Sequence, residues 1–516
     1  MTTFLIPLYY LVSKLAEEKE LRSREGMKMM GLKDASYFLS WFLFYACIVL
    51  VMALIITGVV SINVFPKSSK FLVFLLAFFY GLSLFGFALV IVSILPTMRA
   101  SATAATLLHL ITYFAVFVLK DPDYAYTVKL IFSIFPNIGM SFCVFNLYHF
   151  EANSTGLSYT NAAQWYNNSS YLAGLLMLII DTVFYTGLGL YLDQILQSQF
   201  GVAKKWYFLC TRKFWCSGRR QRGGVDMQEE LYKSCLLNEN SDDEGEGNGR
   251  PKTAMLTNPD DFEAVPETLK RQELSRECLR IRGLRKEFGP KVAVENSNIS
   301  MYNGQIFALL GHNGAGKTTT ISMLTGLIPA TQGRAGVFNL NIFDDMDEFR
   351  KILGVCPQHD VLFESLTPKE HLQLFASFKG TPADRVDEVV NKMIKDIDLV
   401  EVQNQLAGTL SGGQKRKLSV GIAMIGDSKV VILDEPSSGM DTSSRRRLWE
   451  MLKENKQGKI IILTTHYMDE ADILGDRICI MAEGRIKCCG SSLFLKNRYG
   501  VGYNLVIAKR NRSPAP

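Results

Sequence analysis

The sequence predicts a chain of two different parts, an all-α polytopic membrane domain followed by an α/β domain of the P-loop type. Residues 1 to about 200 consist largely of long apolar runs, whereas residues 201–516 have the composition of an ordinary soluble domain. In the second part, a glycine-rich motif that contains a lysine follows an apolar run typical of a buried strand. A chain of 516 residues is also too long for one hydrophobic core, which agrees with a multi-domain fold.

The glycine-rich motif spans residues 311–318 and reads GHNGAGKT, which fits the pattern G-x-x-x-x-G-K-[ST] of a phosphate-binding loop. Its glycines let backbone N–H groups approach phosphate oxygens closely, and the helix that follows directs its positive end at the anion. Lys317 supplies positive charge to the β- and γ-phosphates, and the Thr318 hydroxyl can coordinate Mg²⁺. The residues expected to bind a nucleoside triphosphate are Gly311, Asn313, Gly314, Gly316, Lys317, Thr318 and Thr319.

Four apolar segments of the first part are long enough to cross a membrane, which takes about 20 residues. Three of them, at residues 37–62, 71–95 and 102–119, contain no Asp, Glu, Lys or Arg, and the fourth covers residues 172–192. The sequence therefore predicts a multi-pass membrane protein. Many Lys and Arg flank these spans, so the net charge of +6 does not indicate a nucleic-acid partner.

A fifth apolar segment, residues 130–148, is interrupted by a proline, an asparagine and a glycine. N-glycosylation sequons follow it at Asn153, Asn167 and Asn168, in a stretch without Lys or Arg, which indicates an extracytoplasmic loop. The segment 14–33, by contrast, carries six Lys and Arg, as is typical of the cytoplasmic side. A full crossing by residues 130–148 would contradict this arrangement, so we expect a re-entrant segment or a broken helical hairpin that enters from outside.

Two polar residues lie near the middle of predicted spans, His109 and Asp181. Ionisable groups are costly inside a bilayer, so they usually face protein or water and often carry function. One interpretation is a protonated or hydrogen-bonded Asp181 that fixes helix packing. The other interpretation is a direct contact between His109 and Asp181.

The first residues combine a short apolar run with a charged segment. Residues 3–12 are too short for a span, and we interpret them as the end of a truncated one. Residues 14–34 mix both charges with regularly spaced apolar side chains. They are either a solvated or interface-lying helix or a cytoplasmic amphipathic coupling helix that touches the nucleotide-binding domain.

Changes in composition predict the domain boundaries. From about residue 217 to residue 275 the chain is polar and contains an acidic, glycine-containing block, which is typical of a disordered tether. The predicted parts are the truncated span and coupling helix at 1–35, the transmembrane domain at 36–200, a partly disordered cytoplasmic linker at 201–277 and the nucleotide-binding domain at 278–510.

Further motifs downstream of the phosphate-binding loop point to hydrolysis of the nucleotide. The run KVVILDEP ends a buried strand in two carboxylates, of which Asp434 suits Mg²⁺ and Glu435 suits polarisation of an attacking water. Gln358 follows one apolar strand and His466 ends another. The sequence LSGGQ at residues 410–414 puts a serine and two glycines before an apolar helix, which forms a second anion-binding helix N-terminus.

In this order the motifs resemble those of the ATP-binding cassette (ABC) family. The resemblance implies an ABC cassette with a helical signature subdomain at about residues 366–418, and it implies ATP and Mg²⁺ as cofactors. It identifies Gln358 as the Q-loop residue, which joins Thr318 and Asp434 around the metal. His466 is implied to be the switch histidine near the γ-phosphate. With Glu435 in place as well, this cassette is expected to hydrolyse ATP.

In this family the signature of one cassette covers the ATP that a second cassette holds. The resemblance therefore implies that Ser411, Gly412, Gly413 and Gln414 bind ATP of a partner cassette, from a second half or from a homodimer. Residues 439–441 correspond to the D-loop. Phe288 fits the aromatic residue that stacks on adenine, and core packing is the rival explanation for it.

The resemblance narrows to the A subfamily and covers nearly the whole chain. It rests on residues 18–42, 355–372, 414–441, 465–478 and 491–505. It implies membrane lipid as a partner and a lipid, sterol or other amphipathic substrate that is exported or flipped by an ATPase. Full-length members of this kind have a first span and a large extracellular domain before such a region, and a second half after it.

The spans and the cassette together decide between function classes. A soluble cassette protein is excluded by the spans, and an importer is disfavoured because spans and cassette are fused in one chain. An ATP-gated channel or a transport regulator would share every motif, and it is the alternative to a transporter. In either case we expect a multi-pass membrane protein whose nucleotide-binding domain lies in the cytoplasm.

Overall fold

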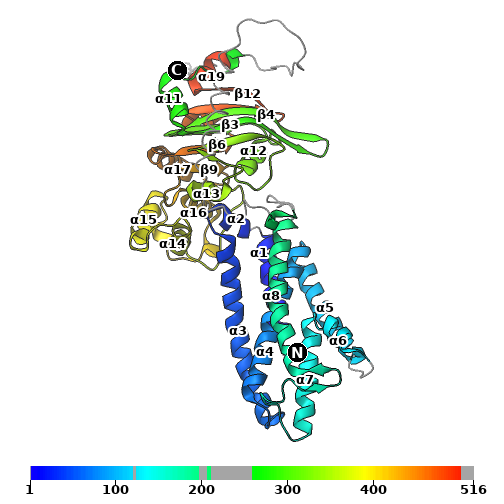
Figure 1. The fold of residues 1–516 in the computed structure, drawn as a ribbon. Coiled ribbons are helices and arrows are strands. Elements are labelled where there is room, and N and C mark those ends of the chain that lie inside the picture. Colours follow the sequence, from blue (N-terminus) through cyan, green and yellow to red (C-terminus); the bar gives the residue numbers. More distant parts are fainter. Residues whose placement is uncertain are drawn as a thin grey trace, which may run out of the picture.

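The computed structural model of the chain describes residues 2–21, 23–119, 124–196, 206–210, 259–500 and 502. These residues form two parts along one long axis, a bundle of helices and an α/β domain seated on its end (Figure 1). This is the predicted fold class, and it is confirmed. The predicted linker lies outside the described residues except for 206–210 and 259–277, as do residues 503–510 of the predicted nucleotide-binding domain.

Four helices of the bundle, α3, α4, α5 and α8, are long and apolar enough to cross a membrane. The bounds of the bundle helices are α1 (Leu5–Glu20), α2 (Ser23–Met29), α3 (Asp34–Asn63), α4 (Lys70–Ile94), α5 (Met98–Leu119), α6 (Tyr126–Phe132), α7 (Pro136–Ala152) and α8 (Tyr171–Ile195). The most buried of the four is α4, which packs against α1, α3, α7 and α8. A glycine allows α4 to approach α8 closely, since a Cβ atom at Gly86 would lie 2.5 Å from the backbone nitrogen of Thr186 in α8.

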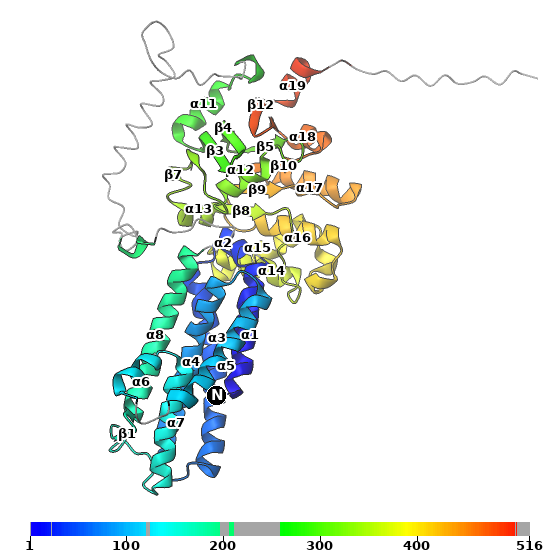
Figure 2. The same cartoon turned by 90° about the vertical axis from the view of Figure 1, so that its right-hand side faces the viewer.

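The segment predicted as one charged helix, residues 14–34, is divided between two helices. The apolar stripe of α1 continues through Leu11, Val12 and Leu15, so this helix extends to Glu20 before it ends. The second helix, α2, is only seven residues long. It lies at the boundary between the bundle and the α/β domain in both views (Figures 1 and 2).

The apolar segment 130–148 is broken into the two short helices α6 and α7. The break falls at residues 133–135, where Pro136 begins α7 in the first-turn position that tolerates a missing N–H. The side chain of Asn137 then ties the break to the bundle. Its Nδ2 donates to the His109 carbonyl and to Thr112 Oγ1, each at 2.8 Å, and its Oδ1 accepts from the Tyr80 hydroxyl at 2.5 Å.

The hypothesis of a direct contact between His109 and Asp181 is wrong. Both side chains are buried, yet His109 Nδ1 and the two carboxylate oxygens of Asp181 have no hydrogen-bond partner among the described residues. The backbone carbonyl of His109, not its ring, makes the interhelical contact, to Asn137. Sequence spacing places each residue at mid-span but does not fix the rotation of one helix relative to another.

The three sequons gather at the end of the bundle that is farthest from the α/β domain. Asn153 directly follows α7, and Asn167 and Asn168 form the two-residue turn between β1 (Trp165–Tyr166) and β2 (Ser169–Ser170). Both turn residues have positive φ, 49° and 52°, as a tight hairpin turn requires. Figure 2 shows this hairpin beside α6 at the lower end of the bundle.

The α/β domain contains two sheets. The bounds of its strands are β3 (Cys278–Phe288), β4 (Lys291–Tyr302), β5 (Gln305–Leu310), β6 (Gln332–Val337), β7 (Leu340–Asn341), β8 (Leu353–Cys356), β9 (Val430–Asp434), β10 (Ile460–Thr465), β11 (Arg477–Ala482) and β12 (Arg485–Gly490). The central sheet has the order β12-β11-β5-β10-β9-β8 and is parallel except for β12, and the second sheet is antiparallel with the order β4-β3-β6-β7. The central strands read as continuous apolar runs because helices cover both faces of the sheet.

The helices of this domain differ in what they cover. They are α11 (Glu267–Ser275), α12 (Lys317–Leu324), α13 (Met346–Ile352), α14 (Pro368–Phe378), α15 (Ala383–Asp396), α16 (Gly412–Met424), α17 (Thr442–Glu454), α18 (Met468–Leu474) and α19 (Ser492–Tyr499). Helices α14, α15 and α16 pack on one another and form a helical lobe on the side that faces the bundle (Figure 1).

The proposed orientation of the bundle leads to a labelling prediction. Three spans and a hairpin that enters from outside separate the turn after α1 from the loop after α7, so these two sites are expected on opposite sides of the membrane. In sealed vesicles that expose the sequon side, a membrane-impermeant maleimide should label Tyr159→Cys directly and Leu21→Cys only after permeabilisation. Both positions are exposed. The parent chain is the control, and equal access to both positions would contradict the orientation.

Candidate nucleotide site

The register of the central sheet brings three predicted motifs to one edge. Strand β10 lies between β5 and β9, with Thr465 opposite Leu310 and Thr464 opposite Asp434. The phosphate-binding loop, Glu435 and His466 each follow directly after one of these aligned strand ends. Strand β8 joins the other side of β9, and Gln358 lies two residues beyond its end. Ligands of open parallel sheets bind at this carboxyl edge.

The phosphate-binding loop is closed by its own lysine. Lys317 is buried, and its Nζ donates to the carbonyl oxygens of Gly311 at 2.6 Å and His312 at 3.2 Å. Burial lowers the pKa of Lys317, while the nearby Glu435 and Asp434 act in the opposite direction. The loop itself needs glycine, because a Cβ at Gly316, where φ is 104°, would lie 2.7 Å from the Ala293 carbonyl oxygen.

The open side of the loop fits a polyphosphate. Gly314 has a φ of 82°, is exposed, and a Cβ there would meet nothing within 4 Å. The first N–H groups of α12, which starts at Lys317, have no carbonyl partner within the helix. Thr318 is exposed beside them, Thr319 is half-buried, and Asn313 is exposed on the loop. Exposed residues of the loop and the N–H groups of the first turn of α12 thus lie beside a lysine and a hydroxyl.

Glu435 is held between two other predicted site residues. Gln358 Nε2 donates to Glu435 Oε2 at 3.3 Å, and His466 Nδ1 lies 3.3 Å from Glu435 Oε1. The backbone of Glu435 has a positive φ of 48°, which is strained for a residue with a side chain. Its N–H donates to the Oγ1 and the carbonyl oxygen of Thr464, and these bonds hold the strained conformation.

The oxygen donors beside the loop fit a magnesium ion. Asp434 is buried and accepts a hydrogen bond from the Thr464 hydroxyl. Burial raises the pKa of the Asp434 carboxyl, so a cation close to it would be favourable. No group of three or more His, Cys, Asp or Glu that could hold a metal occurs in the described part of the chain. Magnesium does not need one, because it is commonly held by one or two protein oxygens together with phosphate oxygens.

The signature residues stand apart from this site. Ser411 caps α16 in a reciprocal pair, in which its Oγ accepts from the Gln414 N–H and Gln414 Oε1 accepts from the Ser411 N–H. Cβ atoms at Gly412 and Gly413 would meet nothing within 4 Å. Across the residues that the structure describes, no hydrogen bond links these four residues to the phosphate-binding loop. The signature therefore forms an open helix N-terminus without a ligand from its own chain.

Phe288 is not a core residue. It is the last residue of β3, its exposed fraction is 49%, and its ring lies 4.9 Å from Lys286 Nζ. The rival explanation by core packing is thereby excluded. An exposed aromatic face beside a cation is available to stack on a base.

Sequence reasoning missed Arg416, which connects the parts of the site. Arg416 is buried, and its guanidinium donates to Asp360 Oδ1 at 3.0 Å and to backbone carbonyls of two segments. These carbonyls belong to Pro357, Gln358, Asp434, Glu435 and Pro436. One side chain of α16 thus fixes the backbone that carries Gln358 and the backbone that carries Glu435. The signal was the middle residue of the run Lys-Arg-Lys after the signature.

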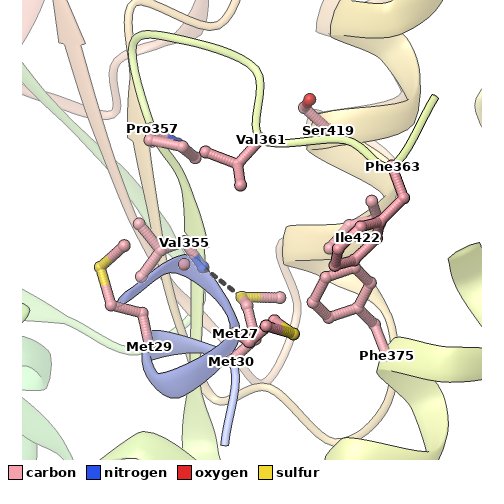
Figure 3. A pocket seen from close by; sticks show the side chains of 11 residues that line it. Met27, Met29, Met30, Val355, Pro357, Val361, Phe363, Phe375, Ser419 and Ile422 are labelled. Carbon is pink, nitrogen blue, oxygen red and sulfur yellow. Dashed lines mark hydrogen bonds between the residues drawn. The ribbon is translucent and has the colours of Figure 1, made fainter. Parts of the chain in front are cut away.

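The α2 helix contacts the α/β domain close to this site. Met27, Met29 and Met30 are buried, and Met30 Sδ accepts a hydrogen bond from the Val355 N–H at 3.4 Å. Figure 3 shows the three methionines on one side of a small cavity of about 30 Å³. The facing residues are Val355, Pro357, Val361, Phe363, Phe375, Ser419 and Ile422. The bundle therefore touches β8, the strand that leads to Gln358.

Arg416→Ala is expected to destabilise the α/β domain strongly. The substitution leaves several buried carbonyl oxygens and Asp360 without a donor, a loss of about 3 kcal/mol that should lower the thermal midpoint of this domain by roughly 6–12 °C. Differential scanning fluorimetry of the whole chain measures this shift. Lys415→Ala is the matched control, because the described residues show no hydrogen bond or ion pair for that side chain. A midpoint for Arg416→Ala equal to that of the control would contradict the connecting role.

Comparison with known proteins places these features in a family. Residues 294–438 match the ABC transporter family, and residues 1–191 match the ABC-2 family transporter protein. The chain is 37% identical over 513 residues to the phospholipid-transporting ATPase ABCA3 of Homo sapiens, which covers 96% of this chain and 28% of the relative. It is 34% identical over 508 residues to the cholesterol transporter ABCA5 of Mus musculus, with coverage of 96% of this chain and 29% of the relative.

A third relative comes from a distant organism. The ABC transporter A family member 5 of Dictyostelium discoideum is 39% identical over 514 residues, which cover 98% of this chain and 30% of the relative. The chain thus spans less than a third of the length of the curated relatives it matches. The solved structure of an ATP-binding subunit of an ABC transporter, 27% identical, covers 43% of this chain and 93% of its own with a TM-score of 0.41. The chain thus contains an ABC transporter cassette and an ABC-2 membrane region, and its similarity to A-subfamily transporters extends over nearly its whole length.

Proposed function

We propose that this chain is the energy-converting part of an ATP-driven transporter that moves lipid or another amphipathic substrate across or out of a membrane. The observation that carries the proposal is the arrangement around Glu435. Its carboxylate lies between Gln358 and His466 and next to Lys317. The described residues of the same chain form four helices long and apolar enough to span a membrane. A protein that only bound the nucleotide would not need a carboxylate held by two neighbours on a strained backbone at this edge.

Each residue of the site has a role in hydrolysis. Lys317 and the N–H groups of the loop would bind the β- and γ-phosphates, and Glu435 would accept a proton from the attacking water. Gln358 and His466 hold the Glu435 carboxylate in position for that water. When bound, Mg²⁺ would neutralise phosphate charge beside Thr318, Gln358 and Asp434.

A second cassette is the partner that this arrangement requires. The signature residues Ser411, Gly412, Gly413 and Gln414 form an open helix N-terminus away from the phosphate-binding loop of the same chain. In the proposed dimer, they bind the ATP that the partner cassette holds, and the partner's signature completes the site of this chain. The partner is either a second half of a longer protein or a second copy.

The contact of α2 with the α/β domain supports coupling of hydrolysis to the membrane half. Its methionines pack on Val355 and Phe375, close to Gln358, which would respond to the nucleotide. Movement of the cassette would thus reach the bundle, with the cassette in the cytoplasm. The lipid substrate is supported by the relatives, of which one is named a phospholipid-transporting ATPase and another a cholesterol transporter.

An ATPase assay in lipid nanodiscs tests the proposal. The chain is measured alone and together with a second half of the same family, beside Glu435→Gln as the control. The control should lower the rate at least about 100-fold, because it removes the general base and leaves the fold unchanged. Activity of the chain alone indicates homodimers, and activity only with the second half indicates an asymmetric transporter. The absence of ATPase activity in both cases would contradict hydrolysis and favour an ATP-gated channel or a transport regulator.

Phe288→Ala is expected to weaken ATP binding without destabilising the fold. Stacking of an aromatic ring on a base contributes about 1–3 kcal/mol, so the Kd for ATP should rise roughly 5- to 150-fold. Phe288→Tyr keeps the ring and should bind ATP as the unmodified chain does. Titration with a fluorescent ATP analogue measures both variants, and an unchanged Kd for Phe288→Ala would remove Phe288 from the site.

A further inference from the structure

Among the residues that the structure describes, the segment from Lys19 to Asp34 contacts one end of each of the four helices that are long enough to span the membrane, and we take this end as the cytoplasmic one. Its charged side chains make these contacts one by one. Lys19 Nζ donates to the Val92 carbonyl of α4 at 2.7 Å, Glu20 Oε2 accepts from the Met98 N–H at the start of α5 at 3.0 Å, Arg24 pairs with Asp193 of α8, and Lys28 pairs with Asp34 of α3 at 2.5 Å. Lys19 and Glu20 are the last residues of α1, whereas Arg24 and Lys28 lie in α2. A shift of α2 would therefore act directly on the ends of α8 and α3.

The Arg24–Asp193 ion pair is the strongest of these contacts. Arg24 Nη1 and Nη2 donate to the two carboxylate oxygens of Asp193 at 2.7 and 2.6 Å, which is a bidentate pair. The exposed fractions of the two side chains are only 9% and 15%. Burial acts against the charge, but the hydrogen bonds to Asp193 raise the pKa of Arg24. The rings of Tyr37 and Phe38 cover the guanidinium at 5.0 and 4.7 Å.

The Lys28–Asp34 pair has a different character. The two residues are six positions apart and join the ends of adjacent helices, so the pair closes a local turn. The exposed fractions of the Lys28 and Asp34 side chains are 16% and 43%, so this pair is only partly buried, and it lacks the bidentate geometry of the Arg24–Asp193 pair. Asp34 Oδ1 also lies 3.4 Å from Arg24 Nη2. By contrast, Arg24 and Asp193 are separated by 169 residues and connect two elements that no short loop joins.

The far part of α8 is in contact with the broken hairpin. The Tyr185 hydroxyl donates to the carbonyl oxygen of Ile134 at 2.9 Å, within the break between α6 and α7. About two turns farther toward the outer end, Leu178 packs beside Gly139, where a Cβ would lie 3.6 Å from the Leu178 side chain. Helix α8 is thus joined to α2 at its cytoplasmic end and to the hairpin farther out.

We propose that Arg24 and Asp193 are the positioning pair that makes α8 follow α2, so that nucleotide-dependent movement of the cassette reaches the α6–α7 hairpin through α8. The inference deepens the proposed function and rests on it. A guanidinium fork held by two hydrogen bonds resists rotation as well as separation, which a single lysine contact does not. The pair therefore transmits both translation and rotation of α2 to α8.

The experiment reads the outer end of α8 while nucleotide is changed at the other end of the chain. Leu172→Cys puts a thiol at an exposed position in the first turn of α8. The whole chain, with its partner cassette, is placed in sealed vesicles that expose the sequon side and contain ATP or no nucleotide. The rate of labelling by a membrane-impermeant maleimide is compared between the two conditions, and binding of a fluorescent ATP analogue is measured in parallel.

We expect ATP to change the labelling rate in the Leu172→Cys chain and Arg24→Met to reduce this change at least about fivefold with unaltered ATP binding. Lys28→Met is the matched control, because it removes a charge from the same helix, and it should retain the change. The reversed pair, Arg24→Asp with Asp193→Arg, should recover part of it. If Arg24→Met does not fold, Asp193→Asn takes its place, since it keeps the shape of the side chain.

Two results would overturn the positioning role. One is a full ATP-dependent change in Arg24→Met, and the other is an equal loss in Arg24→Met and Lys28→Met. Failure of the proposed function looks different, because ATP would then fail to alter labelling or to be hydrolysed in the Leu172→Cys chain that carries no other substitution.

Discussion

The parallel register of β10 between β5 and β9 is the constraint on which the chemistry of this chain depends. It aligns Leu310, Asp434 and Thr465 at one edge, although more than 100 residues of sequence separate the first from the second. A slip by one residue would turn every side chain of a strand to the opposite face and take the carboxylates away from Lys317. The strands resist this slip because they are buried on both faces, so each position is packed.

Arg416 extends this constraint from the sheet to the helical lobe. Because its guanidinium bonds to the backbone on both sides of Gln358 and Glu435, it ties the signature helix α16 to the edge of the sheet that carries the proposed site. Helix α2 packs against the same elements at Val355 and Ile422. The membrane half therefore contacts the cassette at β8 and α16, the two elements that Arg416 connects to the proposed nucleotide site. The proposed nucleotide site and the contact with α2 are thus connected through packed side chains rather than through a flexible linker.

Much of this structure could be predicted from local sequence patterns, whereas its long-range contacts could not. The phosphate-binding loop, the strand-end carboxylates and the long apolar helices each follow from a short stretch of sequence, and the fold class follows from them. The six acceptors of Arg416 come from segments about 60 residues before it and 20 residues after it, so no local pattern reveals them. The same limit explains why residues 14–34 read as one helix in the sequence, and why a contact between His109 and Asp181 stayed one of two open interpretations. The ends of a helix and its rotation about its axis depend on the other elements that it packs against.

The bonds of Asn137 have a consequence for how the bundle adapts to its bilayer. Its amide group bonds to α4 and α5 at one height only, and sliding the hairpin along these helices would leave a polar amide in hydrocarbon, which costs several kcal/mol. The height of the break between α6 and α7 is thus fixed relative to α4 and α5. In a thinner or thicker bilayer, the whole bundle must tilt or the lipid must deform around it, because the hairpin cannot rise or sink alone. A change in membrane thickness is therefore expected to change the tilt of the whole bundle.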